Sequence, residues 1–125
     1  LRVLELAFIP PELEGRIKVR ADDLQRLASA TKACILFGSY ITTKKEPGDL
    51  DVLFVLDKSQ FSLYKNILER VKDITPVKIQ DVIQNIEDLQ QNLKKEDSVI
   101  VEALRNGIVL WGFTVLVKVI KSVHE

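Results

Sequence analysis

The sequence has few of the residues on which several common kinds of functional site depend. It contains one cysteine, Cys34, which excludes an intramolecular disulfide, and the run "ACILF" around it predicts a buried, inert thiol. The only histidine, His124, lies one residue from the end of the sequence and is expected to be exposed. Zinc sites and Ser-His-Asp or Cys-His catalysis are therefore not indicated. Neither a P-loop nor a G-x-G-x-x-G motif occurs.

The sequence also has no excess of charge and no long apolar run. Its 18 Lys and Arg residues balance 18 Asp and Glu residues. We therefore expect no nucleic-acid binding of the sequence-independent kind, which needs a basic surface. No run approaches the ~18 apolar residues of a membrane span, and the first residues lack the apolar region of a signal peptide. These absences favour a cytoplasmic protein with no membrane partner.

The remaining pattern predicts one α/β (α+β) domain in 125 residues, enough for a single hydrophobic core. Residues 1–20 form an N-terminal extension that the pattern does not place, and "RIKVR" within it alternates as a strand does. The predicted core spans about 21–112. It comprises helices at 21–33, 58–74 and, as one or two helices, 85–107; strands at 34–38, 49–56, 77–83 and 108–111; and a C-terminal helix follows at about 113–125.

Two carboxylates begin the most apolar strand, in "DLDVLFVL". Alternate residues of a strand share a face, so Asp49 and Asp51 point the same way, about 6.6 Å apart along the strand. Two such carboxylates repel each other in a partly dry site unless a cation lies between them. Oxygen ligands of this kind suit Mg²⁺, which takes one or two carboxylates and completes its shell with water and phosphates. The pair therefore predicts a metal site.

A third carboxylate, Asp81, lies in the strand "VKIQDVI", where it shares a face with Val77, Ile79 and Ile83. A lone acidic group in an apolar row needs a partner. If the two strands are neighbours, Asp81 completes a triad with Asp49 and Asp51. Three carboxylates would hold two ions about 3.5–4 Å apart, the arrangement that supports phosphoryl or nucleotidyl transfer.

The turn "GS" follows the predicted strand "CILF". Glycine lets the backbone approach a ligand closely, and Ser39 after Gly38 has a hydroxyl and an N–H for a phosphate. In the loop that follows, Lys44 and Lys45 are either phosphate-binding residues or ordinary surface lysines.

The order of these motifs resembles the nucleotidyltransferase superfamily, whose signature is h-G-S, then [S/G]-D-x-D, then a third acidic residue on a neighbouring strand. The short chain is similar to the minimal nucleotidyltransferases of that superfamily. The segments "ILFGS", "GDLDVLFVL", "IQDVI" and "VEALRNGIVLWG" carry the resemblance, within about residues 28–112. The sequence departs from the family pattern in having no arginine in the loop after Gly38-Ser39 and Gly48 where a serine is common.

The resemblance implies a nucleotidyltransferase-like fold, a small mixed sheet flanked by helices. It implies a triphosphate at Gly38, Ser39, Lys44 and Lys45. The ligands of Mg²⁺, as two ions, would be the catalytic residues Asp49, Asp51 and Asp81.

The implied activity is Mg²⁺-dependent transfer of AMP from ATP to a hydroxyl. Minimal nucleotidyltransferases are paired with helical HEPN proteins as antitoxin and toxin, and only thirteen residues follow Gly112. We therefore expect the acceptor to be a partner protein of the HEPN kind, and a homo-oligomer is a further alternative.

Two other interpretations stay open at this point. In the first, the chain is an interaction module of the same fold that binds its partner without catalysis. In the second, it is a plain α+β domain with two turn aspartates and no ligand. The segment "FTVLVKVI" is apolar on nearly every side, so it is either core or a partner-binding surface, and Trp111 has the same two interpretations.

Overall fold

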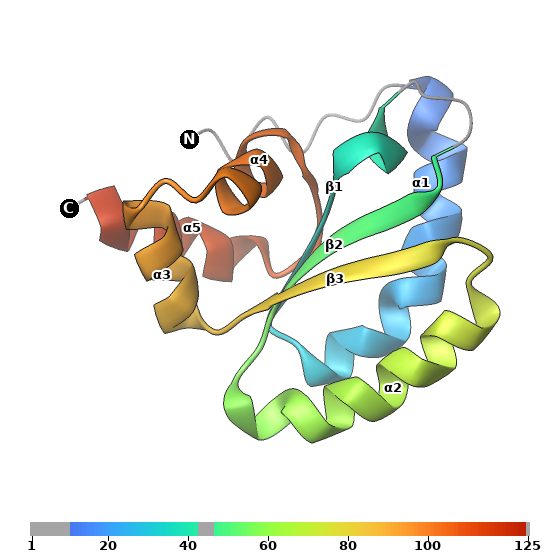
Figure 1. Cartoon of the computed structure of the whole chain (residues 1–125), viewed down its shortest axis with the longest axis horizontal. Helices are drawn as coiled ribbons and strands as arrows, with labels where there is room; N and C mark the ends of the chain where they lie inside the picture. Colours follow the sequence, from blue (N-terminus) through green and yellow to red (C-terminus); the bar gives the residue numbers. More distant parts are fainter. Residues whose placement is uncertain (1–10, 43–46, 125) are drawn as a thin grey trace.

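The computed structural model describes residues 11–42 and 47–124, and a four-stranded mixed sheet lies at its centre (Figure 1). The spatial order is β3-β2-β1-β4. Strand β2 runs antiparallel to β1 and parallel to β3, and β4 runs antiparallel to β1. The strands are β1 (Ala33–Phe37), β2 (Asp49–Val55), β3 (Lys78–Gln84) and β4 (Ile108–Trp111). The predicted class, a small mixed sheet flanked by helices, is confirmed.

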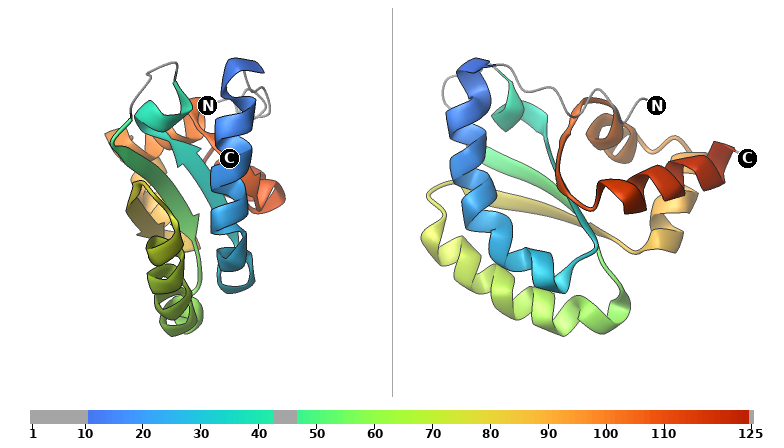
Figure 2. Two further views of the ribbon diagram at one scale, coloured as in Figure 1. Left: turned by 90° about the vertical axis from the view of Figure 1, so that its right-hand side faces the viewer. Right: turned by 180° about the vertical axis from the view of Figure 1, so that it is seen from behind.

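Helices cover both faces of the sheet. Helices α1 (Pro11–Leu24) and α2 (Phe61–Ile74), with the 3-10 helix η2 (Gln25–Ala30), pack on one face, which we name the α1–α2 face. Helices α3 (Ile86–Lys94), α4 (Ser98–Asn106) and α5 (Phe113–His124) pack on the other, the α3–α5 face. In the view from behind, α1 and α2 lie together, away from α3 and α5 (Figure 2). Two short 3-10 helices, η3 (Gly38–Ile41) and η4 (Lys58–Gln60), follow β1 and β2.

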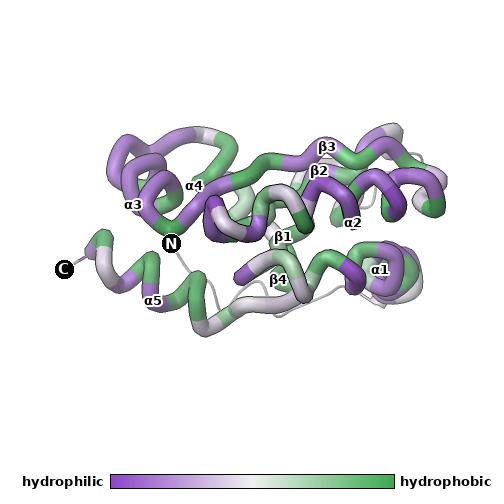
Figure 3. The backbone as a smooth tube through the Cα atoms, turned by 90° about the horizontal axis from the view of Figure 1, so that it is seen from below, coloured by the Kyte–Doolittle hydropathy of each residue, from purple (hydrophilic) through white to green (hydrophobic). Residues whose placement is uncertain are grey.

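The alternation of side chains along the strands divides the core between the two faces. Leu50, Val52 and Phe54 of β2 belong to the cluster on the α1–α2 face, whereas Leu53 and Val55 belong to the cluster on the α3–α5 face. The helices present apolar stripes to these clusters, and their tubes change between hydrophilic and hydrophobic segments along their length (Figure 3). The sheet thus has one apolar cluster on each face, and successive residues of a strand contribute to the two clusters in turn.

Helix α1 begins ten residues earlier than the pattern predicts. Pro11 is its first residue, a position where proline costs no backbone hydrogen bond. The strand-like alternation of "RIKVR" is misleading, because Ile17 is 2% exposed whereas Val19 is 51% exposed. Helix geometry explains this, since Leu13, Ile17 and Leu24 form one buried stripe. Part of the predicted N-terminal extension, residues 1–10, lies outside the described residues.

The carboxyl-terminal third confirms most of its predictions. The region 85–107 forms two helices, and Gly107 is the C-cap of α4, where its N–H donates to the Ala103 carbonyl at 2.9 Å. Strand β4 and helix α5 follow as expected. Much of "FTVLVKVI" is core, because Leu116, Val119 and Ile120 are buried. No helix among the described residues is both long and apolar enough to cross a membrane.

The two remaining composition-based predictions concern Cys34 and Trp111. Cys34 is buried, and burial raises the pKa of its thiol well above the usual value, which keeps the thiol protonated and inert. The half-buried Trp111 packs its ring 6.4 Å from that of Phe54, and its Nε1 donates to Thr31 Oγ1 at 2.9 Å. Trp111 therefore contributes to the core.

Candidate active site

The two aspartates of "DLD" lie together at the amino end of β2. Asp49 is exposed and Asp51 is half-buried. Both point to the α3–α5 face, because every second residue of β2 shares a face and Leu53 and Val55, the next two in that row, belong to the cluster on the α3–α5 face. Helix α3 begins directly after β3, so it lies at the opposite, carboxyl end of the parallel pair β2 and β3 (Figure 1). The predicted pair of carboxylates on one face is confirmed.

The turn after β1 lies against the second of these carboxylates. Phe37 pairs with Asp51 across β1 and β2, so Gly38, the next residue, lies beside the Asp51 side chain. Gly38 has a φ of 76°, in the left-handed region, and Asp51 Oδ2 lies where a Cβ on Gly38 would have to be. Only glycine satisfies both conditions. The Gly-Ser turn and the aspartate strand therefore form one site.

Ser39 begins the short 3-10 helix η3 and is half-buried. Its carbonyl oxygen accepts hydrogen bonds from the Thr42 N–H at 3.1 Å and from Thr42 Oγ1 at 2.6 Å, which closes the turn. Within the described part of the chain, the Ser39 hydroxyl has no hydrogen-bond partner. The hydroxyl is therefore available to a ligand at the position that the sequence predicts for a phosphate.

The electrostatics of the pair are unfavourable without a cation. Burial of Asp51, and after it the negative charge of Asp49, raises the pKa of Asp51 above its ordinary value of 3.8. Both causes disfavour the charged carboxylate. A bound cation would oppose this upward shift, because it stabilises the charged carboxylate.

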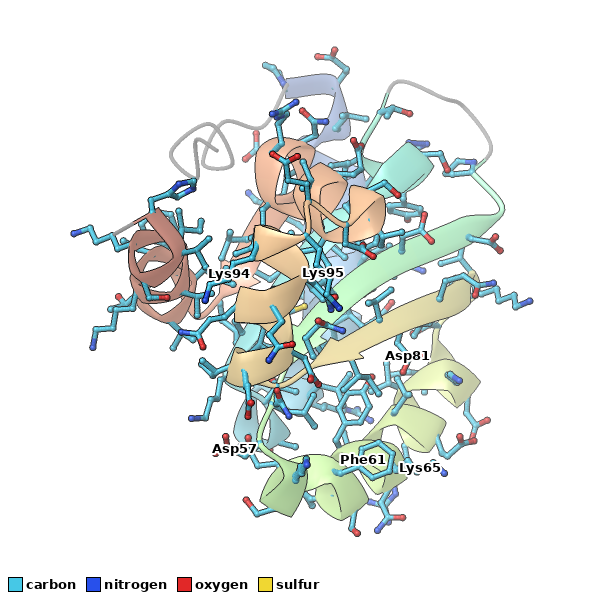
Figure 4. The ribbon with its side chains drawn as sticks, turned by 60° about the vertical axis from the view of Figure 1, so that its left-hand side comes forward. Asp57, Phe61, Lys65, Asp81, Lys94 and Lys95 are labelled. Atoms are coloured by element: carbon cyan, nitrogen blue, oxygen red, sulfur yellow. The ribbon has the colours of Figure 1, made fainter. Side chains whose placement is uncertain are left out.

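Asp81 does not join this site, and the prediction of a three-carboxylate cluster is wrong. Strand β3 does lie beside β2, but Asp81 pairs with Val52 and therefore points to the α1–α2 face. There Asp81 Oδ2 accepts a hydrogen bond from the hydroxyl of the buried Tyr64 at 2.8 Å. Figure 4 shows Asp81 between β3 and helix α2.

The hydrogen bond to Asp81 also changes Tyr64. Burial first, then the hydrogen bond to Asp81 and the charge of that carboxylate, raise the pKa of Tyr64 far above its ordinary value. Tyr64 therefore stays a neutral donor at any physiological pH. Within the described residues, no group of three or more metal-ligating side chains occurs.

Two other residues of β3 face the site in place of Asp81. Gln80 pairs with Asp51 and Lys78 pairs with Asp49, so both share the face of the carboxylates. Sequence reasoning missed them because the register of β3 against β2 was unknown. The alternation of "VKIQDVI" was the available signal: Asp81 lies in the apolar row that packs into the core, so the other row, with Lys78 and Gln80, is the one beside the carboxylates. Lys44 and Lys45 lie outside the described residues, and the exposed Lys78 is a cation that the structure does place here.

A hollow of about 250 Å³ lies at the other end of the parallel pair, where β2 and β3 finish. The side chains of Leu56, Phe61 and Ile83 line it, and Figure 4 shows Asp57 and Phe61 there. Two carboxylates line it, Asp57 and Asp88, and Asp57 is already engaged because it pairs with Lys32 at 3.3 Å and caps η4. This leaves one carboxylate here against two in the Asp49–Asp51 pair, so the pair is the better candidate metal site.

Comparison with known proteins assigns a family without assigning an activity. The family model described as a family of unknown function (DUF6932) matches residues 12–106. The match covers most of the chain, from α1 to the end of α4, so the chain belongs to that family. No curated protein matches the chain.

Replacing Gly38 by alanine tests the contact between the turn and β2. We expect Gly38→Ala to lower the free energy of unfolding by about 1–3 kcal/mol, because the left-handed conformation and the Asp51 carboxylate both oppose a Cβ. Gly48→Ala is the matched control, since a Cβ there meets no atom within 4 Å. Urea denaturation measures both changes. Equal stability of the two variants would contradict the close contact at Gly38.

Replacing Asp51 by asparagine tests the electrostatic cost of the site. Because folding raises the pKa of Asp51, the folded chain binds more protons than the unfolded chain between the two pKa values. The free energy of unfolding therefore falls as pH rises through that interval. In EDTA we expect Asp51→Asn to melt at a higher temperature than wild type at pH 7, with the difference shrinking towards about pH 3.

The exposed Glu69→Gln on α2 removes the same charge far from the site and serves as the control. A melting temperature of Asp51→Asn at or below that of wild type at pH 7 would count against repulsion at the pair.

Proposed function

We propose that this member of the family binds ATP with Mg²⁺ at the amino end of β2 and transfers AMP to a hydroxyl of a partner protein. The observation that supports this most is the contact between Gly38 and Asp51, which brings a phosphate-binding type of turn against a metal-binding type of strand. Neither feature alone has this specificity. The resemblance of the motif order to nucleotidyltransferases supports the same activity.

The side chains suit one magnesium ion. Asp49 and Asp51 provide two anionic oxygen ligands on one face, which is the number that Mg²⁺ usually takes from a protein. Gln80, in register with Asp51, adds a neutral amide oxygen to the same row. The two-ion arrangement needs a third carboxylate, and Asp81 is on the opposite face. We therefore propose a single ion in place of two.

Each residue of the site then has a distinct role. Asp49 and Asp51 would hold the ion, which would offset phosphate charge and polarise the α-phosphorus. Ser39 donates its hydroxyl to a phosphate oxygen, and the ammonium group of Lys78, beside Asp49, attracts the triphosphate. The acceptor oxygen forms a bond to the α-phosphorus, the bond between that phosphorus and the oxygen that bridges it to the β-phosphorus breaks, and pyrophosphate leaves. Asp81, the predicted general base, lies on the opposite, α1–α2 face of the sheet, so the proton of the acceptor hydroxyl passes to water.

The exposure of the site favours a large acceptor. Asp49 is exposed and Asp51 is only half-buried, so a side chain on the surface of another protein has access to the bound triphosphate. An enclosed cavity would instead select a small molecule. The partner that the resemblance implies is a helical protein of the HEPN kind, and its serine, threonine or tyrosine hydroxyls are the proposed acceptors.

A second candidate function is docking without transfer. Gln80 stands where a third carboxylate would complete the metal site, and Asp81 is engaged by Tyr64. Both observations favour weak catalysis or none. In that case the chain binds its partner through the same fold, and the carboxylates contribute a negatively charged patch. Incorporation of labelled AMP into the partner distinguishes the two functions.

Calorimetric titration of ATP into the chain, with and without Mg²⁺, tests the nucleotide site. We expect binding that requires Mg²⁺ and weakens at least about tenfold in an Asp49→Asn, Asp51→Asn double variant, because the ion loses both anionic ligands. Asp81→Asn is the matched control and should bind within about twofold of wild type, because it lies on the opposite face.

The opposite outcomes are equally informative. An Asp81→Asn variant that weakens binding as much as the double variant would contradict the face assignment. If ATP does not bind to the wild-type chain under any condition, the enzymatic function is excluded and docking without transfer becomes the favoured function.

Restoring a third carboxylate tests the single-ion site. Gln80→Glu keeps the shape of the side chain and adds an anionic oxygen beside Asp51. We expect Mg²⁺-dependent ATP binding to tighten by about tenfold, which corresponds to about 1.4 kcal/mol. Gln25→Glu adds the same charge at an exposed position of η2, where it should change binding little. Unchanged or weaker binding in Gln80→Glu would show that this row does not face the ion.

A further inference from the structure

Arg16 of helix α1 reaches across to the turn that follows β1. Its Nη1 donates to the carbonyl oxygen of Tyr40 at 3.4 Å and to that of Thr42 at 3.3 Å. Its guanidinium carbon also lies 5.0 Å from the centre of the Tyr40 ring. The arginine is separated from these residues by 24 and 26 positions in the sequence, so only the tertiary structure brings them together.

These contacts act on the end of η3 that lies away from the site. The helix begins at Gly38 and Ser39, beside Asp51, and ends at Ile41. Carbonyl groups at the end of such a turn carry partial negative charge and lack partners within the turn. The guanidinium binds two of these carbonyls and stacks on a buried tyrosine, so it holds the far end of the turn against α1.

We propose that Arg16 is a positioning residue for the phosphate-binding turn. It keeps η3 in the form in which Ser39 lies beside Asp51 and offers its hydroxyl to a bound triphosphate, and it touches no reacting atom itself. The phosphate part of this role rests on the proposed function. The clamp on the turn rests only on the contacts between Arg16, Tyr40 and Thr42.

The chemistry of the contacts requires arginine. A planar guanidinium stacks on a ring and donates two hydrogen bonds in its own plane, whereas a lysine ammonium is a compact, strongly hydrated charge. Lysine at this position reaches a carbonyl but lacks the stacking. We therefore expect Arg16→Lys to retain part of the clamp and Arg16→Ala to lose it.

Amide hydrogen exchange together with ATP titration tests the role. The Thr42 amide reports the turn directly, because it donates to the Ser39 carbonyl at 3.1 Å. The Phe54 amide, in the centre of the sheet, reports global unfolding. In Arg16→Ala we expect Thr42 exchange to accelerate by about tenfold while Phe54 exchange changes little, and Mg²⁺-dependent ATP binding to weaken by about tenfold. Arg16→Lys should show smaller changes in both.

Lys18→Ala is the matched control on the same helix. Lys18 is exposed, and among residues 11–42 and 47–124 it pairs with Glu14 alone, at 3.0 Å, one turn along α1, so its loss should change neither Thr42 exchange nor binding. If the Thr42 and Phe54 amides accelerate equally in Arg16→Ala, the arginine acts on global stability and the proposal is overturned.

Failure of the clamp and failure of the proposed function give different results. Unchanged Thr42 exchange in Arg16→Ala overturns the clamp, whatever the nucleotide result. Faster exchange with unchanged affinity, in a wild type that binds ATP, overturns the phosphate role alone. If the wild-type chain does not bind ATP, the proposed function is excluded, and so is the role of Arg16 in phosphate binding. The exchange data still decide whether Arg16 holds the turn.

Discussion

The contact between Asp51 and Gly38 is the constraint on which the candidate site depends. The antiparallel register of β1 and β2 sets Phe37 opposite Asp51, and the carboxylate then occupies the space that a side chain at Gly38 would need. Two segments that are separated by a loop in the sequence therefore become a single surface. If the register moved by one residue, Asp51 would point to the α1–α2 face and the turn would have no carboxylate beside it.

The two faces of strands β2 and β3 carry different kinds of side chain. On the α1–α2 face, β2 contributes Leu50, Val52 and Phe54 to a core, and the only acidic residue that β3 sends there is bound by Tyr64. On the α3–α5 face, apolar packing holds the carboxyl half of β2 and the amino end stays polar. A rigid, buried strand thus supports the exposed Asp49 and the half-buried Asp51, and a strand would fix the geometry of the proposed ligand better than a loop.

The carboxylate pair is electrostatically unfavourable in the folded chain. Burial and the neighbouring Asp49 both disfavour a charged Asp51, and no protein cation within the described residues forms an ion pair with either carboxylate. A chain selected for stability alone would place neutral side chains at these positions. The proposed Mg²⁺ would offset this unfavourable arrangement, and the proposed Arg16 clamp would hold the neighbouring turn in place for the phosphates.

The sequence by itself determined most of the elements of this protein. Apolar runs and one alternating segment located the four strands, and apolar stripes located helix α2, because these patterns depend on each element's own burial. The sequence also indicated the helical region after β3, as one or two helices, and the C-terminal helix. The spacing of two placed Asp49 and Asp51 on one face. The apolar run "CILF" placed Gly38 and Ser39 at the end of a buried strand.

Only the tertiary structure decided which residues of different elements meet. The register of β3 against β2 turned Asp81 towards Tyr64 and brought Lys78 and Gln80 to the carboxylates, and the packing of α1 brought Arg16 to the turn. The register of two strands depends on how all their residues pair and pack in the whole sheet, and a shift of one residue turns every side chain to the other face. The sequence pattern of one strand therefore does not show which residue of the neighbouring strand each of its residues meets.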